Sequence, residues 1–237
     1  MSSGPSHSSR RREFLTGCRD ELPILLGVVP FGMIYGVLAL GAGFSRLAAQ
    51  SMSSVVFAGS AQLITAQLWR EAAPGAVIVL TVFVVNLRHA LYSASVAPYL
   101  RHLGPPWKGI LAYLLTDEAY AVAVTRYIRD GDRADVSPFR HWYFLGAGLT
   151  LWASWQLSTA AGVFLGGVVP RSWSLDFTLP LTFIALVFPG LRDRGGIAAA
   201  LSAGILAVLV VGLPFKLGLV AAAFAGIAIG LAVEANA

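Results

Sequence analysis

The stretch that decides the fold class is Thr81-Val-Phe-Val-Val-Asn86-Leu-Arg88-His89-Ala-Leu-Tyr92. It lies in the middle of a long apolar run, residues 74–98, and yet it places Asn86, Arg88 and His89 close together. A membrane helix needs about 20 apolar residues to cross a hydrocarbon core of roughly 30 Å. Arg88 therefore falls near mid-depth, where an unpaired charge costs about 2.5–3.5 kcal/mol.

The next apolar segment, residues 108–129, carries Asp117 and Glu118 at its own centre. Because consecutive spans run antiparallel, we expect Arg88 and His89 to lie level with these two acids. Two acids then face one permanent cation, and histidine titrates near neutrality. The pattern favours a site for proton coupling formed by Arg88, His89, Asp117 and Glu118. A structural ion pair that locks two helices is the alternative.

The composition is that of a polytopic membrane protein. Of 237 residues, 57% are hydrophobic and 12% are charged, whereas an ordinary soluble domain has about 25% charged residues. The net charge of +5 comes mostly from basic residues at span ends, which set topology and do not indicate nucleic-acid binding. The single Cys18 excludes an intrachain disulfide framework and a multi-cysteine metal site. We expect no metal and no cofactor.

We expect an all-α bundle of about eight transmembrane helices. Residues 1–21 are polar, Ser-rich and basic, which predicts a disordered cytoplasmic tail, and residues 22–237 are expected to form a single transmembrane transporter domain. The sixth segment is short and contains Pro180 and Pro189, so seven spans or a re-entrant segment are alternatives. The expected spans are residues 22–43, 47–69, 75–97, 108–129, 142–168, 175–191, 196–213 and 216–234.

The distribution of basic residues predicts the orientation of these spans. With the N-terminus inside, eleven Lys and Arg residues lie on the cytoplasmic side and five on the outer side. Cytoplasmic loops carry the excess of Lys and Arg, so this orientation is favoured. An even number of spans then places the C-terminus inside as well. The expected location is the inner (cytoplasmic) membrane, with the lipid bilayer around a multi-pass chain.

Polar and aromatic residues within the spans are candidates for a substrate site. Pro30 between Gly27 and Gly32 predicts a kink or an unwound turn, which is either a binding turn or a packing kink. Gln62 carries an amide that can bind a zwitterionic ligand. Trp152, Trp155 and Gln156 form a face suited to an apolar ligand body with a polar end, or else fill space between helices. The candidate substrate-binding residues are Pro30, Phe31, Gly32, Phe57, Ser60, Gln62, Asn86, Trp152 and Gln156.

Two further patterns concern symmetry and packing. The sequence Ser60-Ala-Gln62-Leu in the second span is echoed by Ser154-Trp-Gln156-Leu in the fifth. Those spans run in opposite directions, as an inverted repeat requires. The last two spans are almost pure Ala, Gly, Val, Leu and Ile, which indicates scaffold helices or a surface that faces a partner.

Five motifs, in order, resemble the AzlC-type branched-chain amino acid exporters, the large subunit of the two-component LIV-E family. They are Pro30-Phe31-Gly32, Phe57-Ala58-Gly59-Ser60-Ala61-Gln62, Asn86-Leu87-Arg88-His89, Thr116-Asp117-Glu118 and Leu151-Trp152. The resemblance covers about residues 22–190. It implies efflux of leucine, isoleucine and valine, with methionine as a further candidate substrate. It also implies a small membrane partner subunit of AzlD type.

The expected function is a secondary transporter that exports branched-chain and similar hydrophobic amino acids, coupled to the proton gradient. We do not expect an enzyme. Nothing in the sequence resembles a nucleotide-binding loop, so a primary energy source would have to be another subunit. One alternative is an intramembrane enzyme that uses His89, Asp117 and Glu118. The other is a non-transporting scaffold subunit in which the Arg88, Asp117 and Glu118 cluster only supports assembly.

Both termini should be accessible from the cytoplasmic side. We expect a membrane-impermeant maleimide to label Ser3→Cys and Asn236→Cys variants in inside-out vesicles and not in intact cells. The variants are made in a Cys18→Ser background, which serves as the unlabelled control. Labelling of the two positions from opposite sides would mean an odd number of crossings and would contradict this topology.

Overall fold

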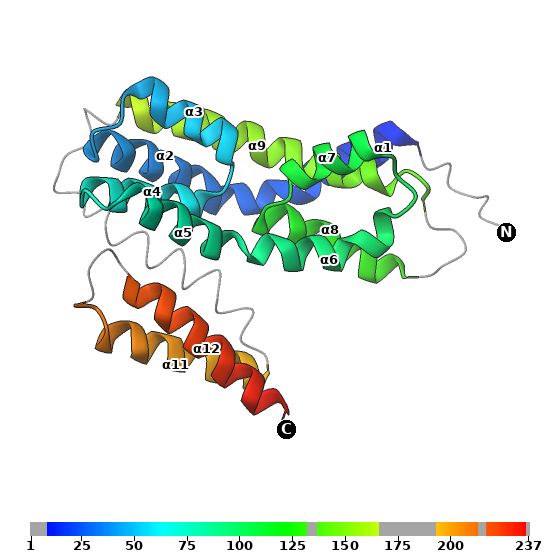
Figure 1. The fold of residues 1–237 in the computed structure, drawn as a ribbon. Helices are drawn as coiled ribbons and strands as arrows, with labels where there is room; N and C mark the ends of the chain where they lie inside the picture. The colour runs from blue at the N-terminus through cyan, green and yellow to red at the C-terminus, as the bar shows by residue number, and fades with distance from the viewer. Residues whose placement is uncertain (1–8, 132–136, 166–192, 213–216, 236–237) are drawn as a thin grey trace, which may run out of the picture. The chain divides into compact units, whose positions relative to one another are not determined.

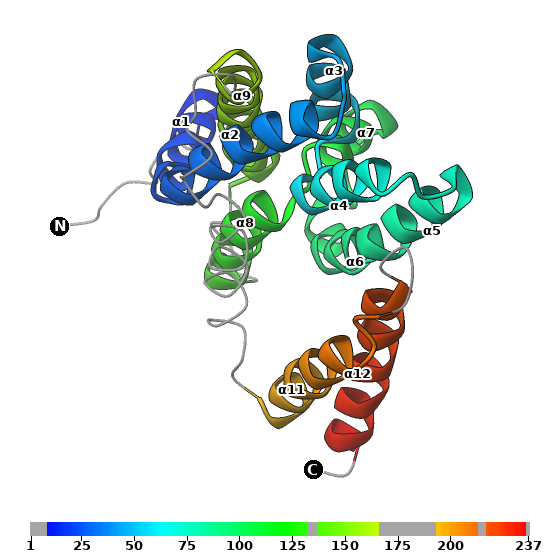
Figure 2. The ribbon, with the colours of Figure 1, turned by 90° about the vertical axis from the view of Figure 1, so that its left-hand side faces the viewer.

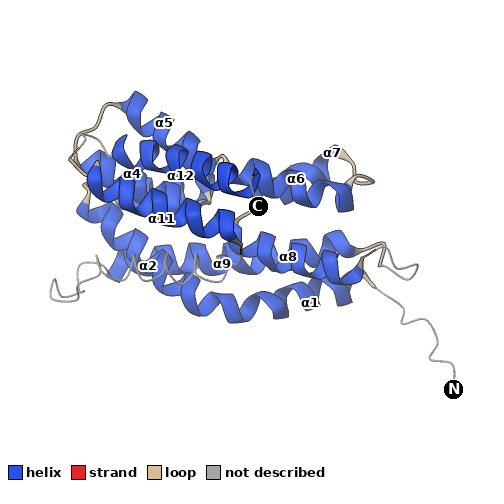
Figure 3. Cartoon of the chain, turned by 90° about the horizontal axis from the view of Figure 1, so that it is seen from below, coloured by secondary structure: helices blue, strands red, loops and turns tan. Residues whose placement is uncertain are grey.

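The described part of the chain consists of helices that are joined by loops and turns (Figures 1 and 3). The structure is a computed structural model, and it describes residues 9–131, 137–165, 193–212 and 217–235. The sixth expected span, residues 175–191, lies outside these residues. The all-α class is confirmed for the residues described. The helices are α1 (Arg10–Glu21), the 3₁₀ turn η1 (Leu22–Ile24), α2 (Leu25–Gly41), α3 (Arg46–Val56), α4 (Gly59–Arg70), α5 (Gly75–Asn86), α6 (Arg88–Leu100), α7 (Pro105–Tyr113), α8 (Asp117–Asp130), α9 (Arg140–Leu165), α11 (Arg194–Leu209) and α12 (Leu217–Ala235).

The chain divides into two compact units, where we expected a single domain. Unit 1 comprises Met1–Leu63 and Asn86–Val168, and unit 2 comprises Ile64–Val85 and Val169–Ala237. All of the candidate site residues named from the sequence belong to unit 1. The function therefore has to be argued from the geometry of unit 1.

Helix α9 is the axis of unit 1, and α1 and α2 pack along it (Figure 2). Glycines permit this close packing. A Cβ atom on Gly17 of α1 would collide with the carbonyl oxygen of Tyr143, and one on Gly36 of α2 would lie 2.6 Å from that of Thr159. Small residues at such contacts let two helix backbones touch, which is how membrane helices gain packing energy without a hydrophobic driving force.

Residues Arg10–Glu21 form α1, where we expected a disordered tail. The hydroxyl of Ser9 caps the helix by accepting from the backbone N–H of Arg12 at 3.2 Å. The buried residues Glu13, Gly17 and Glu21 recur every four positions, so they share one face, and α1 packs against α8 and α9. The arginines of this segment lie on its exposed side. They dominate its composition, so composition alone predicted disorder and did not reveal the buried face.

The expected second span turns back on itself near its middle. Between α3 and α4, Phe57 adopts the left-handed conformation with φ 39° and ψ 47°. The hydroxyl of Tyr35 in α2 donates to the Ala49 carbonyl in α3 at 3.0 Å, and the same side chain contacts Gln62 in α4. A chain that continued straight on would carry Gln62 away from Tyr35. We call residues 46–63 the first hairpin and Phe57–Ala58 its tip.

The expected fourth span is a second hairpin, with α7 and α8 as its arms and residues 114–116 as its tip. Trp107, near the start of α7, lies edge-on to His141 with ring centroids 4.8 Å apart. Tyr127, near the end of α8, donates to the carbonyl of Arg140 at 3.1 Å. Both ends of the segment thus contact the first turn of α9, so the chain turns back at the tip.

The two hairpins enter unit 1 from opposite ends of α9, and their tips meet. Arg46, at the start of the first hairpin, lies 5.8 Å from the ring centre of Phe164 near the end of α9. The second hairpin begins and ends at the start of α9. At the tips, the rings of Phe57 and Tyr113 lie 5.9 Å apart.

This arrangement corrects the expectation that residues 47–69 and 108–129 cross the membrane as straight spans. It also reverses a direction, because α6 and α8 run parallel and not antiparallel. Tyr92 stacks on Tyr120 at 4.4 Å and Tyr99 lies 5.1 Å from Tyr127, so both helices advance together. The physical reason is the turn before α8, which Thr116 caps by accepting from the backbone N–H of Ala119 at 3.4 Å.

Helix α2 continues through Pro30, so the predicted unwound turn does not form there. A proline removes only its own N–H donor, and α2 is held along its length by packing on α9. The interruptions occur instead at Phe57, at Leu87 between α5 and α6, and at residues 114–116.

Three helical stretches among the described residues are long and apolar enough to cross a membrane: Arg10–Gly41, Gly75–Leu100 and Leu217–Ala235. A shorter apolar helix, Arg194–Leu209, accompanies them. The chain is therefore a polytopic membrane protein. A hairpin enters and leaves on the same side of the membrane. Replacing two of the expected crossings by two hairpins therefore keeps the number of crossings even, and we still propose that both termini lie on the cytoplasmic side.

In unit 2, helices α11 and α12 form an antiparallel pair. A Cβ atom on Gly226 would lie 2.7 Å from that of Ala203, and one on Gly230 would lie 2.8 Å from that of Ala199. The pair is thus held by the same kind of close glycine contact as α9 and its neighbours.

The glycine contact between α2 and α9 can be tested within one helix. We expect Gly36→Ala to lower the free energy of unfolding by about 1–3 kcal/mol, because the added methyl group meets fixed backbone atoms. Gly41→Ala in the same helix is the control, since nothing lies within 4 Å of its Cβ position. The measurement is thermal unfolding in detergent, and equal melting temperatures for the two variants would contradict the packing.

Candidate functional site

Side chains from α7 and α9 stabilise the tip of the first hairpin. The last four carbonyl groups of a helix have no partner within it. Gln156 Nε2 donates to the carbonyl of Ser53 at 3.1 Å, and the hydroxyl of Tyr113 donates to the carbonyl of Ser54. Because the bilayer core offers no water, these bonds are what permits α3 to end at membrane depth.

Gln156 and Trp152 are both engaged in this support. Gln156 Oε1 accepts from Gln50 Nε2 and from the hydroxyl of Ser54, both at 2.9 Å. The indole N–H of Trp152 donates to the hydroxyl of Tyr113 at 2.7 Å. The geometry assigns the two residues a structural role, and their predicted contact with substrate stays a prediction.

The N-termini of α4, α6 and α8 meet at Arg88. The guanidinium Nη1 forms an ion pair with Asp117 Oδ2 at 2.6 Å, and Nη2 donates to Ser60 Oγ at 2.5 Å. Ser60 lies in the first turn of α4 and Asp117 is the first residue of α8. The predicted proximity of Arg88 and Asp117 is therefore confirmed, and the ion pair connects both hairpins through α6.

The helix dipoles make Arg88 depend on Asp117. A helix N-terminus favours acidic residues by about 0.3–1 kcal/mol and disfavours a cation at that position. Asp117 at the start of α8 is in a favourable place, whereas Arg88 at the start of α6 is not. The side chains are 31% and 26% exposed, so water screens the pair only in part.

Glu118 interacts electrostatically with Arg88 but does not form an ion pair with it, whereas we expected both acids to face this cation. Successive residues of a helix are about 100° apart, so Asp117 and Glu118 leave α8 in different directions. Asp117 pairs with Arg88, whereas Glu118 interacts electrostatically with Glu21 at the end of α1. Within the described ranges Glu118 has no ion-pair partner. The four predicted residues therefore interact as one cluster, in which Arg88 and Asp117 form the direct ion pair.

His89 lies beside the Arg88 ion pair. Its Nδ1 lies 3.1 Å from the carbonyl oxygen of Asn86, which fits an N–H donor at that ring nitrogen. Its ring is edge-on to Tyr92 at 5.9 Å, and Tyr92 in turn lies close to Asp117. His89 therefore reaches the acid through an aromatic neighbour rather than by direct contact.

A second group of candidate residues packs behind the first tip. Gln62 is fully buried, and its Oε1 accepts from the indole N–H of Trp155 at 3.1 Å. The ring of Phe31 lies 5.6 Å from that of Trp155. A Cβ atom on Gly59 would lie 2.8 Å from Trp155 and 2.9 Å from Phe31, so only glycine fits there.

The structure does not bring Pro30 and Gly32 into this group as ligand-binding residues. Pro30 is exposed on the outside of α2. Gly32 is buried against Ser158 of α9, where its missing side chain permits close helix packing. Of the two readings of the Pro30 turn, the geometry favours packing.

Several buried polar atoms around the tips have no hydrogen-bond partner among the described residues. They are Gln62 Nε2, Asn86 Oδ1, Arg88 Nε and Asp117 Oδ1. Buried polar groups in proteins nearly always find a partner in protein, water or ligand. Donors and acceptors of this kind at one place suit a small zwitterionic molecule. The described ranges contain no group of three or more His, Cys, Asp or Glu arranged to hold a metal ion.

Four residues that the structure places beside the candidate residues are absent from the predicted site: Glu21, Tyr92, Tyr113 and Trp155. Tyr92 could have been found four positions after Arg88 on one helical face. Trp155 was seen beside Trp152, but the sequence could not tell which of the two meets Gln62. Tyr113 and Glu21 depend on the hairpin and on α1, neither of which was predicted.

The ion pair predicts a specific pattern of rescue. Arg88→Ala leaves the Asp117 carboxylate unpaired, which should lower stability by about 2–3 kcal/mol and reduce the yield of folded protein. Adding Asp117→Asn should restore the yield. Adding Glu118→Gln instead is the matched control and should not, because Glu118 does not form an ion pair with Arg88. The measurement is the yield of protein that is monodisperse in detergent. Equal rescue of this yield by Asp117→Asn and Glu118→Gln would contradict the geometry.

Comparison with known proteins fits a membrane protein with this site. Residues 23–169 match the model of the AzlC protein family, and no solved structure is significantly similar to the chain. It is 31% identical to an uncharacterized membrane protein of Archaeoglobus fulgidus over 92% of this chain and 94% of that protein.

Two relatives have informative names. The inner membrane protein YgaZ of Escherichia coli is 26% identical over 85% of this chain and 83% of its own. The branched-chain amino acid transport protein AzlC of Bacillus subtilis is 25% identical over 76% of this chain and 70% of its own. With the membrane-length helices, the first name confirms the predicted inner-membrane location. The matched region contains both hairpin tips and the Arg88 ion pair, and the chain belongs to the AzlC protein family.

Proposed function

We propose that the chain is a secondary transporter that exports branched-chain and similar hydrophobic amino acids, coupled to protons and working with a small AzlD-type membrane subunit. The observation that carries this proposal is the pair of hairpins whose tips meet beside the half-buried Arg88–Asp117 ion pair. Secondary transporters bind their substrates at such interrupted helices near mid-depth. The name of the Bacillus subtilis relative supports the substrate class.

An inverted repeat supports a transport mechanism. A membrane-length stretch, Arg10–Gly41, is followed by the first hairpin, and a second such stretch, Gly75–Leu100, is followed by the second hairpin. The hairpins enter from opposite ends of α9, as repeats of inverted topology do. The repeat thus pairs residues 10–70 with 75–130, and not the short echo between residues 60–63 and 154–157. Rocking of one repeat against the other gives alternating access.

The polar end of the amino acid fits the first tip. The N-terminus of α4 favours a carboxylate, and Ser60 and the free Nε2 of Gln62 are donors beside it. The free Oδ1 of Asn86 is an acceptor for the ammonium group. Phe31, Phe57 and Trp155 supply an apolar wall, where one methylene is worth about 1–3 kcal/mol, so discrimination among branched side chains is modest.

The charged groups supply the coupling. Asp117 and Glu118 attract a substrate ammonium group, and a proton on either acid weakens that attraction. Substrate and proton therefore exclude each other, which is the condition for exchange of one for the other. Arg88 holds Asp117 in place, and His89, through Tyr92, extends the polar cluster.

A cavity of about 290 Å³ provides access to this region. It is lined by residues of α6, α7, α9 and the second tip, and it extends from Arg101 and Lys108 to Ser93 and Leu115. Leu115 belongs to the tip itself. The cavity thus extends from the end of unit 1 where α9 begins to the second tip.

Membership of the AzlC family, a transport family, favours a transporter over the intramembrane enzyme. The scaffold alternative is tested by flux. In proteoliposomes that contain the chain and its co-purified small subunit, we expect external labelled leucine to accumulate against trapped unlabelled leucine, isoleucine or valine. Trapped aspartate or lysine is the control and should not support accumulation. Counterflow with neither leucine, isoleucine nor valine would contradict the proposed function.

Gln62 provides a residue-level test of the substrate site. Gln62→Leu should weaken leucine binding roughly tenfold, which corresponds to a lost hydrogen bond to a charged group of about 1.5 kcal/mol. Gln67→Leu, five residues further along α4, is the matched control and should bind leucine like the unchanged protein. The measurement is the leucine concentration that gives half-maximal counterflow. Equal values in both variants would place the carboxylate elsewhere.

A further inference from the structure

Glu21 is a fully buried acid whose carboxylate has no partner. Its exposed fraction is 0%, and neither Oε1 nor Oε2 has a hydrogen-bond partner among the described residues. It lies at the end of α1, directly before the 3₁₀ turn η1. An ionised carboxylate in such a place is costly, and a protonated carboxyl group much less so.

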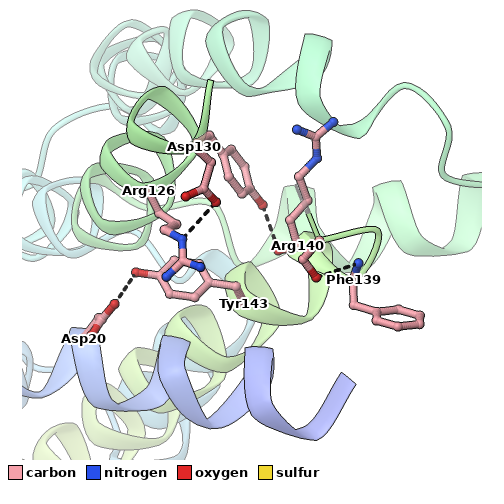
Figure 4. A network of polar contacts seen from close by, with 8 residues as sticks. Asp20, Arg126, Asp130, Phe139, Arg140 and Tyr143 are labelled. Atoms are coloured by element: carbon pink, nitrogen blue, oxygen red, sulfur yellow. Dashed lines mark hydrogen bonds and ion pairs between the residues drawn. The ribbon is translucent and has the colours of Figure 1, made fainter. Parts of the chain in front are cut away.

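The charged groups around Glu21 do not neutralise it. From α8, the facing group is Glu118, a second acid. From α9, it is Tyr143, whose hydroxyl donates to Asp20 Oδ2 at 2.8 Å rather than to Glu21. Arg126 of α8 lies over the Tyr143 ring and pairs with Asp130 at 2.9 Å (Figure 4). Arg126 is therefore already paired with Asp130, and Arg88, which also interacts electrostatically with Glu118, is paired with Asp117. Neither cation forms an ion pair with Glu21 or Glu118 among the described residues.

A cavity lies near this pair, although neither Glu21 nor Glu118 is among its lining residues. The cavity, of about 560 Å³, opens between α1, η1 and α8, with Tyr143 of α9 in its wall. Its lining includes Asp20 and Pro23, which flank Glu21 at close range in the chain, and Ala121, one turn after Glu118. Of the residues labelled in Figure 4, Asp20, Arg126 and Tyr143 line this cavity.

From this geometry we propose that Glu21 and Glu118 together form the binding site for the coupling proton. The pair holds one proton between two carboxyl groups, so that its net charge changes from −2 to −1 when the proton binds. The proton is taken up from one side of the membrane and released to the other as the hairpins alternate. Asp117, fixed by Arg88, then remains ionised and belongs to the substrate side of the site.

This inference rests on the proposed transport function and assigns it a group that the sequence did not reveal. Two carboxylates that repel each other cannot both stay ionised without a cation, as in other paired acids. Export is coupled because the substrate ammonium group and the proton each relieve the same negative charge. Loss of one carboxyl group from the pair removes the need for the proton but leaves the substrate contacts at the first tip intact.

The test compares two transport modes in proteoliposomes with the small subunit present. For Glu21→Gln, we expect leucine counterflow to continue, while export driven by a pH gradient falls to the rate measured without a gradient. Glu13→Gln is the matched control, because Glu13 is also buried on the same face of α1. It should keep both modes. Full pH-driven export by Glu21→Gln would overturn the proposal and leave the proposed function standing.

Two further arms keep the result decisive. Infrared difference spectra of the purified unchanged protein across a pH step should show the carbonyl band of a protonated carboxylic acid, and this band should weaken in Glu21→Gln. An unaltered band would overturn the assignment even if the protein transported nothing, so failure of the two proposals can be told apart. If Glu21→Gln does not assemble, Glu21→Asp must shift the pH dependence of export, and an unchanged dependence overturns the proposal. Replacement of Na⁺ by choline should leave pH-driven export intact, and loss of export would identify Na⁺ instead.

Discussion

The structure depends on one constraint: backbone groups that a helix leaves free at membrane depth must find partners inside the protein. Both hairpins reverse where no water can bind their ends. The carbonyl groups of Ser53 and Ser54 therefore accept hydrogen bonds from Gln156 and Tyr113, respectively. The hydroxyl of Thr116 accepts a hydrogen bond from the backbone N–H of Ala119 in the first turn of α8. The partners of the first tip belong to α9 and α7, so this tip depends on other elements of unit 1, whereas Thr116 caps α8 from within the second tip.

The same reversals create the chemistry. A continuous helix hides its N–H groups, whereas an interrupted one presents a positive N-terminus at mid-depth. Three such ends, those of α4, α6 and α8, meet around Arg88. This concentration of positive potential is balanced by Asp117, Glu118 and Glu21, which lie on different faces of the junction. A site with charges of both signs separated over a short distance suits a zwitterion, and it explains why so polar a cluster is found in an otherwise apolar chain.

The sequence predicted some of this correctly, and in one case for an incorrect reason. Apolar run lengths predicted an all-α membrane protein, and the depth of Arg88 and Asp117 predicted their contact. That contact forms between parallel helices, because α8 turns back, and not between the antiparallel spans that we assumed. The turn at Phe57 has no sequence signal, since a left-handed conformation is ordinarily a position for glycine or asparagine. Pro30, which carries the stronger signal, lies in a continuous helix.

Glu21 and α1 were missed for a different physical reason. The serines and arginines of the tail predict disorder. The spacing of its buried residues, Glu13, Gly17 and Glu21, which recur every four positions, is instead that of one face of a helix. A polar helix with one compact face is stabilised by what it packs on, here α9, and not by its own hydrophobicity. Local sequence therefore sets the helices of this protein, while their interruptions and pairings are set by residues far away in the chain.

The dependence of the first tip on α9 has a consequence for biogenesis. Gln156 follows Ser53 by about a hundred positions, so at the usual rate of synthesis, about 5–20 residues per second, roughly 5–20 s pass before it leaves the ribosome. During that interval the nascent first hairpin has unsatisfied carbonyl groups and cannot rest in the hydrocarbon core. The first hairpin must therefore stay at the bilayer surface or within the insertion machinery. It can enter the hydrocarbon core only after α9 has been synthesised and Gln156 can bind its carbonyl groups.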